Sequence, residues 1–351
     1  MLIIMRKDST PEQCQRVEEA IRQMGFAPLR VPGADRTAIC VTGNKGPVES
    51  AFLSRLPGVF ECMPVTKPYK LVSREVHPQD TVLDVSGVKL GGPEPTLIAG
   101  PCSVETESRT LEVARQVKKC GAHMFRAGAF KPRTSPYSFQ GLGGEGLVTL
   151  RRVRQEVGLP VVSEVVDTDS AEAVAECVDV LQVGARNMQN FSLLKKLADL
   201  GKPVLLKRGM AATLDEWLMA AEYILAGGNH RVVLCERGVR TFNNHSRNTL
   251  DLNVVPLVRQ VSHLPVLVDP SHGVGNRERV RPLARAALAA GAHGLLIEVH
   301  THPEMSYSDA GQTIDIETFR GLVRDADLLR QLPPLFENWP TLPKKKTGPL
   351  S

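Results

Sequence analysis

The chain has 351 residues, a length that suggests two domains or one large domain with a smaller attachment. With 42% hydrophobic and 23% charged residues it can bury a sizeable core, which excludes global disorder, and no long heptad repeat points to a fibrous protein. The net charge of +5 suits anionic small molecules at least as well as nucleic acid, and an aromatic content of 5% argues against a surface that stacks bases.

The seven cysteines are scattered and form no Cys-x-x-Cys pair, which indicates reduced thiols in a cytoplasmic protein. The apolar opening Met1–Met5 is too short for the core of a signal peptide. No apolar run approaches the roughly 20 residues that span a bilayer. We therefore expect a soluble cytoplasmic protein with no membrane partner.

Residues 1–66 are predicted to form a small βαββαβ domain of the ferredoxin-like (ACT-like) type. Thr10 and Pro11 begin its first helix as N-cap and first-turn proline, and Gly25 ends that helix. The other expected elements are strands at 2–5, 26–31, 37–42 and 59–65, and a short helix near 47–55.

Residues 67–95 are predicted to be a proline-containing linker that ends in a β-hairpin of 81–85 and 88–90. From residue 96 to 332 apolar strands alternate with amphipathic helices, which predicts a (β/α)₈ barrel, with a doubly wound sheet as the alternative. The expected strands are 96–100, 123–127, 161–165, 180–183, 204–207, 232–235, 266–269 and 294–299. The expected helices are 107–120, 147–156, 170–178, 192–200, 214–225, 254–261, 279–290 and 316–329. Residues 333–351 are predicted to be a flexible tail.

The run from Gly141 to Gly146 matches the Gly-x-Gly-x-x-Gly pattern of dinucleotide-binding loops. That pattern binds a pyrophosphate only where a strand leads directly into it, and here the polar stretch 132–140 precedes it. We interpret it as a loop that leads into a barrel helix, with no nicotinamide cofactor.

Positive side chains lie at or just after the ends of several predicted strands. Because a barrel gathers the carboxyl ends of its strands at one mouth, these cations are expected to converge and to bind phosphate or carboxylate groups. A rim of ordinary salt bridges is the alternative, and it explains one or two of them. The cations are Arg126, Lys131, Arg133, Arg186, Lys207, Arg208 and Arg237.

A second group lies at the ends of the first, seventh and eighth strands, which are neighbours in a closed barrel. It comprises Cys102, His272, Glu298 and Asp309. Mixed sulfur, nitrogen and oxygen ligands suit a divalent ion such as Mn²⁺, Fe²⁺, Co²⁺ or Zn²⁺ better than Mg²⁺. Each residue also has an ordinary structural explanation, so the spacing alone leaves both possibilities open.

Together these motifs resemble the 3-deoxy-D-arabino-heptulosonate 7-phosphate (DAHP) synthases of type Iβ. The likeness spans about residues 70–330, and residues 1–65 resemble the regulatory domain that some members carry. The motifs are Gly100-Pro101-Cys102-Ser103, Lys131-Pro132-Arg133-Thr134-Ser135, Gly184-Ala185-Arg186, Lys207-Arg208-Gly209 and Asp269-Pro270-Ser271-His272-Gly273.

The resemblance implies condensation of phosphoenolpyruvate with erythrose 4-phosphate, the first step of the shikimate pathway to aromatic amino acids. It implies one divalent metal ion on Cys102, His272, Glu298 and Asp309. The resemblance implies that phosphoenolpyruvate is bound by Arg126, Lys131, Gly184, Ala185, Arg186, Lys207 and Arg237. It implies that erythrose 4-phosphate is bound by Arg133, Thr134, Ser135 and Asp309. The catalytic candidates are Lys131, Cys102, His272 and Glu164.

The resemblance also implies a homotetramer, and the extra domain predicts inhibition by tyrosine or phenylalanine. The sister family, 3-deoxy-D-manno-octulosonate 8-phosphate synthase, uses arabinose 5-phosphate and is the main alternative. The Lys131–Ser135 motif and the extra domain favour the four-carbon sugar. A metal-dependent aldolase of another pathway and a regulatory binding protein with an inactive barrel are further alternatives. We expect no nucleic-acid partner, since one pocket explains the cations.

Overall fold

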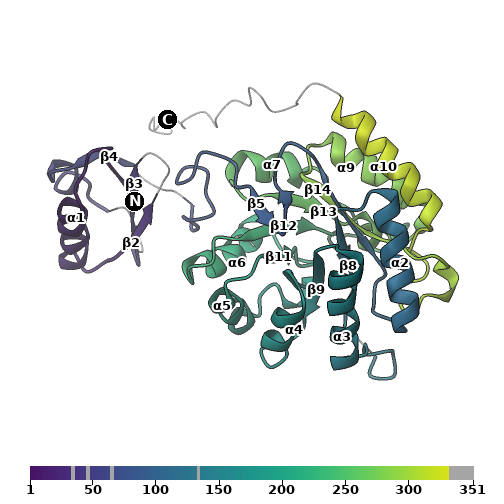
Figure 1. The fold of residues 1–351 in the computed structure, drawn as a ribbon. Coiled ribbons are helices and arrows are strands. Elements are labelled where there is room, and N and C mark those ends of the chain that lie inside the picture. The colour runs from purple at the N-terminus through teal and green to yellow at the C-terminus, as the bar shows by residue number, and fades with distance from the viewer. Residues whose placement is uncertain (33–35, 45–47, 64–66, 133–134, 332–351) are drawn as a thin grey trace. The chain divides into compact units, whose positions relative to one another are not determined.

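A computed structural model describes residues 1–32, 36–44, 48–63, 67–132 and 135–331 (Figure 1). The chain divides into two compact units, Met1–Gln79 and a larger one that begins at Asp80. The tail predicted at 333–351 and the two predicted site residues Arg133 and Thr134 lie outside the described residues.

The first unit is an antiparallel sheet covered on one face by the helix α1 (Pro11–Gln23). Its strands follow the order β2-β3-β1-β4, with bounds β1 Leu2–Met5, β2 Ala27–Pro32, β3 Thr37–Thr42 and β4 Val59–Met63. Thr10 caps α1 in a capping box with Gln13. Apolar side chains of α1 and the sheet form one core, including Ile3, Val17, Ile21, Ile39 and Val41.

The second helix predicted near 47–55 is wrong. Among the described residues of this stretch the structure has a single 3₁₀ turn, η1 (Leu53–Arg55). Pro57 and Gly58, which has a φ of +84°, turn the chain soon afterwards, so too few residues remain to propagate an α-helix. On the other face of the sheet Val76 packs against Leu2 and Cys40, which ties the segment after β4 to this unit.

The second unit is a closed barrel of eight parallel strands, as predicted (Figure 1). The strands run β7-β8-β9-β10-β11-β12-β13-β14 around the barrel, and β14 pairs with β7 to close it. Their bounds are β7 Thr96–Gly100, β8 Met124–Arg126, β9 Val161–Val165, β10 Val180–Val183, β11 Val204–Lys207, β12 Val232–Glu236, β13 Val266–Val268 and β14 Gly294–Glu298.

The helices form an outer layer, and each lies within a few residues of its predicted place. Their bounds are α2 Glu107–Cys120, α3 Gly144–Arg152, α4 Ala171–Cys177, α5 Phe191–Leu200, α6 Leu214–Ala226, α7 Val254–Val261, α9 Arg277–Ala289 and α10 Ile316–Arg330. The glycine run 141–146 leads into α3 with no β-strand directly before it among the described residues, as expected of a loop. A short helix α8 (Pro270–Val274), capped by Asp269, was not predicted.

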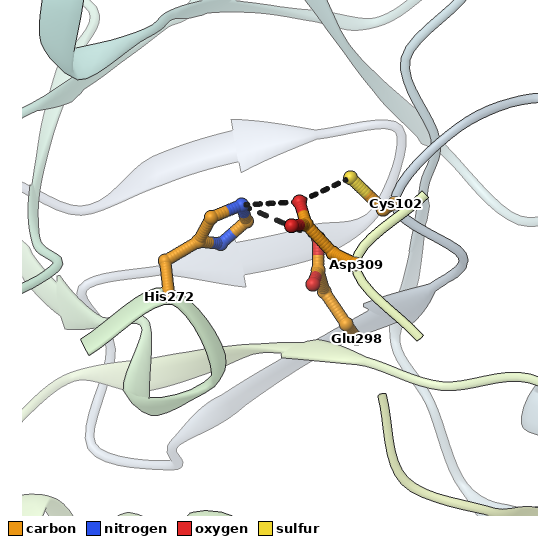
Figure 2. A group of neighbouring side chains, drawn as sticks. All are labelled: Cys102, His272, Glu298 and Asp309. Atoms are coloured by element: carbon orange, nitrogen blue, oxygen red, sulfur yellow. Dashed lines mark hydrogen bonds and ion pairs between the residues drawn. The ribbon is translucent and has the colours of Figure 1, made fainter. Parts of the chain in front are cut away.

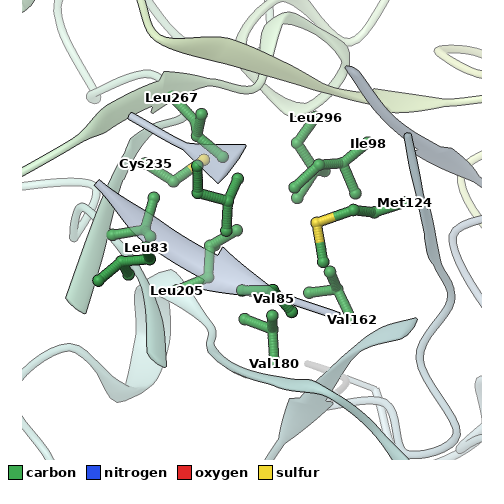
Figure 3. Packing of buried hydrophobic residues seen from close by; sticks show 12 residues of the cluster. Leu83, Val85, Ile98, Met124, Val162, Val180, Leu205, Cys235, Leu267 and Leu296 are labelled. Atoms are coloured by element: carbon green, nitrogen blue, oxygen red, sulfur yellow. The ribbon is translucent and has the colours of Figure 1, made fainter. Parts of the chain in front are cut away.

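The hairpin of β5 (Leu83–Val85) and β6 (Val88–Leu90) closes the amino-terminal end of the barrel (Figure 3). Its apolar side chains pack on the first inward-facing residues of the strands, among them Met124, Val180, Leu205 and Leu267. Because this end is filled with hydrocarbon, the opposite end is left for polar groups. Within the described part of the chain, no helix is both long and apolar enough to cross a membrane.

Candidate active site

Four potential metal ligands meet at the carboxyl end of the barrel: Cys102, His272, Glu298 and Asp309 (Figure 2). One ligand atom of each lies within 4.8 Å of the others. Cys102 follows β7, His272 lies on α8 after β13, Glu298 ends β14, and Asp309 lies in the loop after β14. The pairing of β13 with β14 and of β14 with β7 brings them together. Two carboxylates, an imidazole and a thiol fit a borderline divalent cation.

Asp269 orients the imidazole of His272. Its Oδ2 accepts a hydrogen bond from Nδ1 of His272 at 2.7 Å, and its Oδ1 accepts from the His272 backbone N–H. Nδ1 therefore carries the hydrogen, and Nε2 is free to face Glu298 at 3.4 Å. A histidine that binds metal usually donates its other N–H to a carboxylate in this way. Burial lowers the pKa of His272, which favours the neutral, ligating form.

Lys131 lies against Cys102. Its Nζ donates to the carbonyl oxygen of Cys102 and approaches the sulfur at 3.2 Å. Burial and the neighbouring Glu298 nevertheless raise the pKa of the Cys102 thiol to about 12. Gly128 makes room for the ammonium, because a Cβ there would come within 2.7 Å of Nζ. The lysine is thus held at the edge of the cluster.

A pocket of about 350 Å³ opens beside the cluster, and its walls are rich in cations. Seven positive side chains line it, and all come from strand ends or the loops that follow them. They are Arg126, Lys131, Arg186, Lys207, Arg237, Arg240 and Arg247. The predicted residues Cys102, Ser135, Glu164, Gly184, Ala185, His272 and Asp309 also line it. The structure therefore gathers the described site residues around one pocket, with Glu298 behind them in the cluster.

Buried hydrogen bonds fix the floor of the pocket. Arg126 donates to Glu298 at 3.0 Å and to the side-chain oxygen of Gln182 at 3.1 Å. Gln182 in turn donates to Glu164 at 3.1 Å. The Glu164 carboxylate lies against Gly184, where a Cβ would come within 2.0 Å of its oxygen, so a larger residue there would displace this carboxylate. These residues connect β8, β9, β10 and β14 into one rigid surface.

The cations differ in their partners. Lys207 pairs with Asp269 at 2.5 Å. Arg237 is buried, yet no carboxylate of the described residues lies within ion-pair distance of it, and its side chain donates only to the Gly238 carbonyl. Burial lowers its pKa, with Asp269 acting in the opposite sense. A buried guanidinium without an anionic partner is costly, so this position favours an anionic ligand.

Arg208 does not belong to the pocket. It pairs with Glu236 at 3.1 Å and with Asp251 at 2.9 Å, behind the rim. The salt-bridge alternative thus holds for Arg208. Adjacent residues of a strand point to opposite faces, so the Arg208 side chain lies on the other side of the barrel wall from that of Lys207. Sequence reasoning missed Gln182, Arg240, Arg247, Asn248, Asp269 and Gln312. Only Asp269 had a signal, since it lies three residues before His272 in a capping position.

Glu105 fastens the loop that carries Asp309 to the loop that carries Cys102. Its two oxygens accept from Arg109 at 2.9 Å, from the backbone N–H of Tyr307 at 2.9 Å, and from Nε2 of His300 at 3.3 Å. Nδ1 of His300 accepts from the N–H of His302, which leaves the ring hydrogen on Nε2. Burial acts to raise the pKa of Glu105, but these hydrogen bonds outweigh it and lower that pKa.

Fold and site define a (β/α)₈ barrel with a potential metal cluster beside a pocket lined by cations. The sequence model of the DAHP synthetase I family matches residues 74–332, and that of the DAHP synthase ferredoxin-like domain matches residues 1–67. The chain belongs to the DAHP synthetase I family.

Two curated relatives frame this assignment. Phospho-2-dehydro-3-deoxyheptonate aldolase of Thermotoga maritima is 47% identical over 93% of this chain and 96% of its own length. A 2-dehydro-3-deoxyphosphooctonate aldolase of Koribacter versatilis is 35% identical over 70% of this chain and 95% of its own length.

Two solved structures are also similar to this chain. The crystal structure of the Thermotoga maritima phospho-2-dehydro-3-deoxyheptonate aldolase (DAHP synthase) superposes with a TM-score of 0.75 at 46% identity, covering 93% of this chain and 96% of the other. A truncated form of the Thermotoga maritima DAHP synthase gives a TM-score of 0.70 at 48% identity over 74% of this chain and 96% of the other.

Replacement of Glu105 by glutamine is expected to lower the free energy of unfolding by about 1–3 kcal/mol. An amide has one acceptor oxygen and turns an NH₂ group toward the remaining donors of this buried network. Urea denaturation of the two proteins measures the difference. Glu107→Gln is the matched control, because Glu107 is an exposed carboxylate whose one ion-pair partner among the described residues is Arg152. It should change the value by less than about 1 kcal/mol. Equal effects of both substitutions would refute the role given to Glu105.

Proposed function

We propose that this protein is a DAHP synthase that condenses phosphoenolpyruvate with D-erythrose 4-phosphate and water to give 3-deoxy-D-arabino-heptulosonate 7-phosphate and phosphate. The observation that carries the proposal is the cationic pocket directly beside the four-ligand cluster. The similarity to the Thermotoga maritima relative over both units of the chain supports it. The reaction is proposed as the first step of aromatic amino acid biosynthesis in the cytoplasm.

The octulosonate alternative has less support. The Koribacter versatilis relative aligns with 70% of this chain, whereas the heptonate relative aligns with 93%. Residues 1–67 match a domain that is described for DAHP synthases. The proposed sugar substrate is therefore the four-carbon aldose phosphate.

Phosphoenolpyruvate is proposed to lie in the inner part of the pocket. Its phosphate and carboxylate would meet Arg126, Lys131, Arg186, Lys207 and Arg237, with Gly184 and Ala185 forming the wall at Arg186. Arg237 supports this placement most directly, since it is buried and has no carboxylate partner among the described residues. Bidentate hydrogen bonds from guanidinium groups would fix the orientation of the enol, so that C3 faces the second substrate.

Erythrose 4-phosphate is proposed to lie in the outer part, toward Ser135 and Asp309, which both line the pocket. Arg133 and Thr134 are proposed to bind its phosphate together with Ser135. The aldehyde would then point to the cluster of Cys102, His272, Glu298 and Asp309, because Asp309 borders both the pocket and the cluster. Two anions held in register replace a bimolecular encounter by a bound geometry.

One divalent ion (Mn²⁺, Fe²⁺, Co²⁺ or Zn²⁺) is proposed to bind Cys102, His272, Glu298 and Asp309. When bound, it supplies Lewis-acid polarisation of the aldehyde oxygen. Three of the four side chains already direct a ligand atom toward one another. Nε2 of His272 is the free nitrogen, while Asp309 and Glu298 each direct one oxygen toward it, at 3.9 Å and 3.4 Å.

The remaining chemistry falls to protein groups. C3 of phosphoenolpyruvate forms a bond to the aldehyde carbon, and Lys131, at the edge of the cluster, can give a proton to the oxygen that becomes a hydroxyl. Water adds at C2, and phosphate leaves by cleavage of its bond to C2. Glu164 is a candidate to take the proton of that water, since it lines the pocket. His272 is a weaker one, because Asp269 already engages its Nδ1 and its Nε2 faces the cluster.

The proposed reaction is tested by product analysis. Protein treated with a chelator should lose turnover of phosphoenolpyruvate with erythrose 4-phosphate, and Mn²⁺ should restore it with release of one phosphate per sugar acid formed. Arabinose 5-phosphate should give no product. A folded, metal-loaded sample without turnover would exclude the proposed enzymatic activity. Condensation without phosphate release would point to another aldolase.

The variant Lys131→Met should lower kcat by about 10²–10⁴-fold, because it removes the proposed proton donor. The control is Lys119→Met, on the exposed side of α2, which should leave kcat unchanged.

Metal binding should release close to one proton. The thiolate is the metal ligand, and the thiol of Cys102 has a pKa of about 12, so binding displaces its proton. His272 adds none, since burial lowers its pKa and it is neutral at pH 7. Between pH 6 and 9 the apparent Kd for Mn²⁺ should fall about tenfold per pH unit. Calorimetry in two buffers of different ionisation enthalpy counts the protons. Cys102→Ala should release none, and binding without proton release by the unaltered protein would remove Cys102 from the ligand set.

Regulation is proposed for the amino-terminal part of the chain. Residues 1–66 would form the regulatory domain, and 96–332 the catalytic barrel, linked by 67–95. An aromatic amino acid, tyrosine or phenylalanine, would bind to the first domain and close the barrel mouth. The match of residues 1–67 to the ferredoxin-like domain supports this proposal. The assembly is proposed to be a homotetramer, as the family resemblance implies.

Removal of residues 1–79, which form one compact unit, is expected to leave turnover in place and to abolish inhibition by tyrosine or phenylalanine. The solved truncated form of the Thermotoga maritima enzyme, which covers 74% of this chain, supports the use of a shortened protein. Initial rates of the full-length and shortened proteins over a range of each amino acid measure the effect. Equal inhibition of both proteins would locate the effector elsewhere.

A further inference from the structure

Arg247, in the loop between β12 and α7, reaches the potential metal cluster from outside. Its Nη1 donates to Oδ1 of Asp309 at 3.1 Å and to the side-chain oxygen of Gln312 at 2.8 Å. Nothing in the sequence around Arg247 indicates this role. The Arg247 side chain is 42% exposed at the pocket, so its position depends on these two acceptors rather than on burial.

Gln312 connects Arg247 to a second carboxylate by hydrogen bonds. It is buried at 2% exposure, and its Nε2 donates to Oε2 of Glu298 at 2.5 Å. The amide orientation follows from its two partners, because the guanidinium of Arg247 can only donate to the amide oxygen, which leaves the NH₂ group to donate to Glu298. Arg247 therefore holds one carboxylate directly and the other through a single buried amide.

The two carboxylates are held by the oxygens that face away from the cluster. Asp309 gives Oδ1 to Arg247, while its Oδ2 faces the Cys102 sulfur at 3.2 Å. Glu298 gives Oε2 to Gln312, while its Oε1 accepts from Arg126 at 3.0 Å and also faces Nε2 of His272 at 3.4 Å. Arg247 and Gln312 thus each hold one oxygen of a carboxylate whose other oxygen lies among the ligand atoms.

Asp309 needs such an anchor. Its φ is +55°, in the left-handed region that non-glycine residues seldom adopt. The loop from 299 to 315 has to supply this conformation while it brings a ligand to the cluster. A charged hydrogen bond from Arg247 stabilises the turn and fixes the carboxylate orientation at once.

We propose that Arg247 and Gln312 are positioning residues of the metal site, which hold Asp309 and Glu298 in the orientation that binds the ion. This inference rests on the metal centre of the proposed function. Neither residue is a ligand or takes part in the chemical step. Loss of either should therefore weaken metal binding before it affects the chemistry.

The sign of the change separates this role from simple electrostatics. A guanidinium beside a dication repels it, so removal of a charge alone would tighten metal binding. Removal of a positioning residue weakens it, and substitution of a residue that orients metal ligands typically costs 10–100-fold in affinity. The two effects act in opposite directions.

The experiment measures the Kd of Co²⁺ for full-length protein by competition with a chelator and records the Co²⁺ absorption spectrum, which reports thiolate ligation and geometry. Arg247→Met and Gln312→Leu should each raise the Kd by about tenfold or more and alter the spectrum. Because both act through one chain of contacts, the double variant should lose less than the product of the single losses. Arg247→Lys, which retains charge and one donor, should recover part of the affinity.

Arg240→Met is the matched control. Arg240 lies in the same loop and lines the same pocket, and within the described residues no hydrogen bond or ion pair joins it to the four ligands. Its loss should leave the Kd unchanged or slightly lower, with the same spectrum. Circular dichroism checks folding, and the exposure of Arg247 makes its replacement compatible with the fold.

Wild-type affinity and spectrum in both Arg247→Met and Gln312→Leu would overturn the inference, and so would tighter binding in both. Turnover of the unaltered protein is measured in parallel. A protein that binds Co²⁺ through its thiolate but does not condense the substrates would contradict the proposed function and leave the positioning role intact. An active protein whose variants bind the ion normally would contradict the positioning role alone.

Discussion

The structure depends above all on the parallel pairing of β14 with β7, which runs from Gly294 opposite Thr96 to Glu298 opposite Gly100 and closes the barrel. This pairing joins the last strand to the first. It brings Cys102 within 3.2 Å of Asp309, although 207 positions separate them in the chain. The hairpin β5–β6 fills the opposite end with apolar side chains (Figure 3). The ligand cluster and the cation-lined pocket at the carboxyl end are both consequences of barrel closure.

Concentrating so many positive charges at one mouth is costly, and two buried ion pairs below the pocket offset part of that cost. Arg126 is neutralised by Glu298, and Lys207 by Asp269, both as buried ion pairs. The same carboxylates belong to the ligand cluster or orient one of its members, since Glu298 is one of the four and Asp269 holds His272. The cation-lined pocket and the cluster are therefore one electrostatic unit. A substitution in the pocket should therefore change the electrostatics of the cluster, and the reverse.

Much of this was predictable from sequence because it depends on local periodicity. Apolar strands and amphipathic helices alternate from residue 96, and the barrel strands begin within a residue of their expected positions. The convergence of Cys102, His272, Glu298 and Asp309 also followed, since the order of strands in a barrel is the order in the chain. Local rules failed where context decides: at residues 47–55, where a helix was too short to form, and at Arg208, whose partners Glu236 and Asp251 come from other segments.

The sequence by itself determined which strands would form, their order, and therefore which residues would reach the mouth of the barrel. These follow from side-chain periodicity and from the chirality of strand–helix–strand units, which act over short stretches of chain. Only the tertiary structure decided which cation pairs with which carboxylate. It also decided that Asp269, Gln312 and Arg247 form hydrogen bonds with residues of the ligand cluster. Such contacts join loops far apart in the chain. Their geometry is fixed by the packing of several loops at once, and no local pattern encodes it.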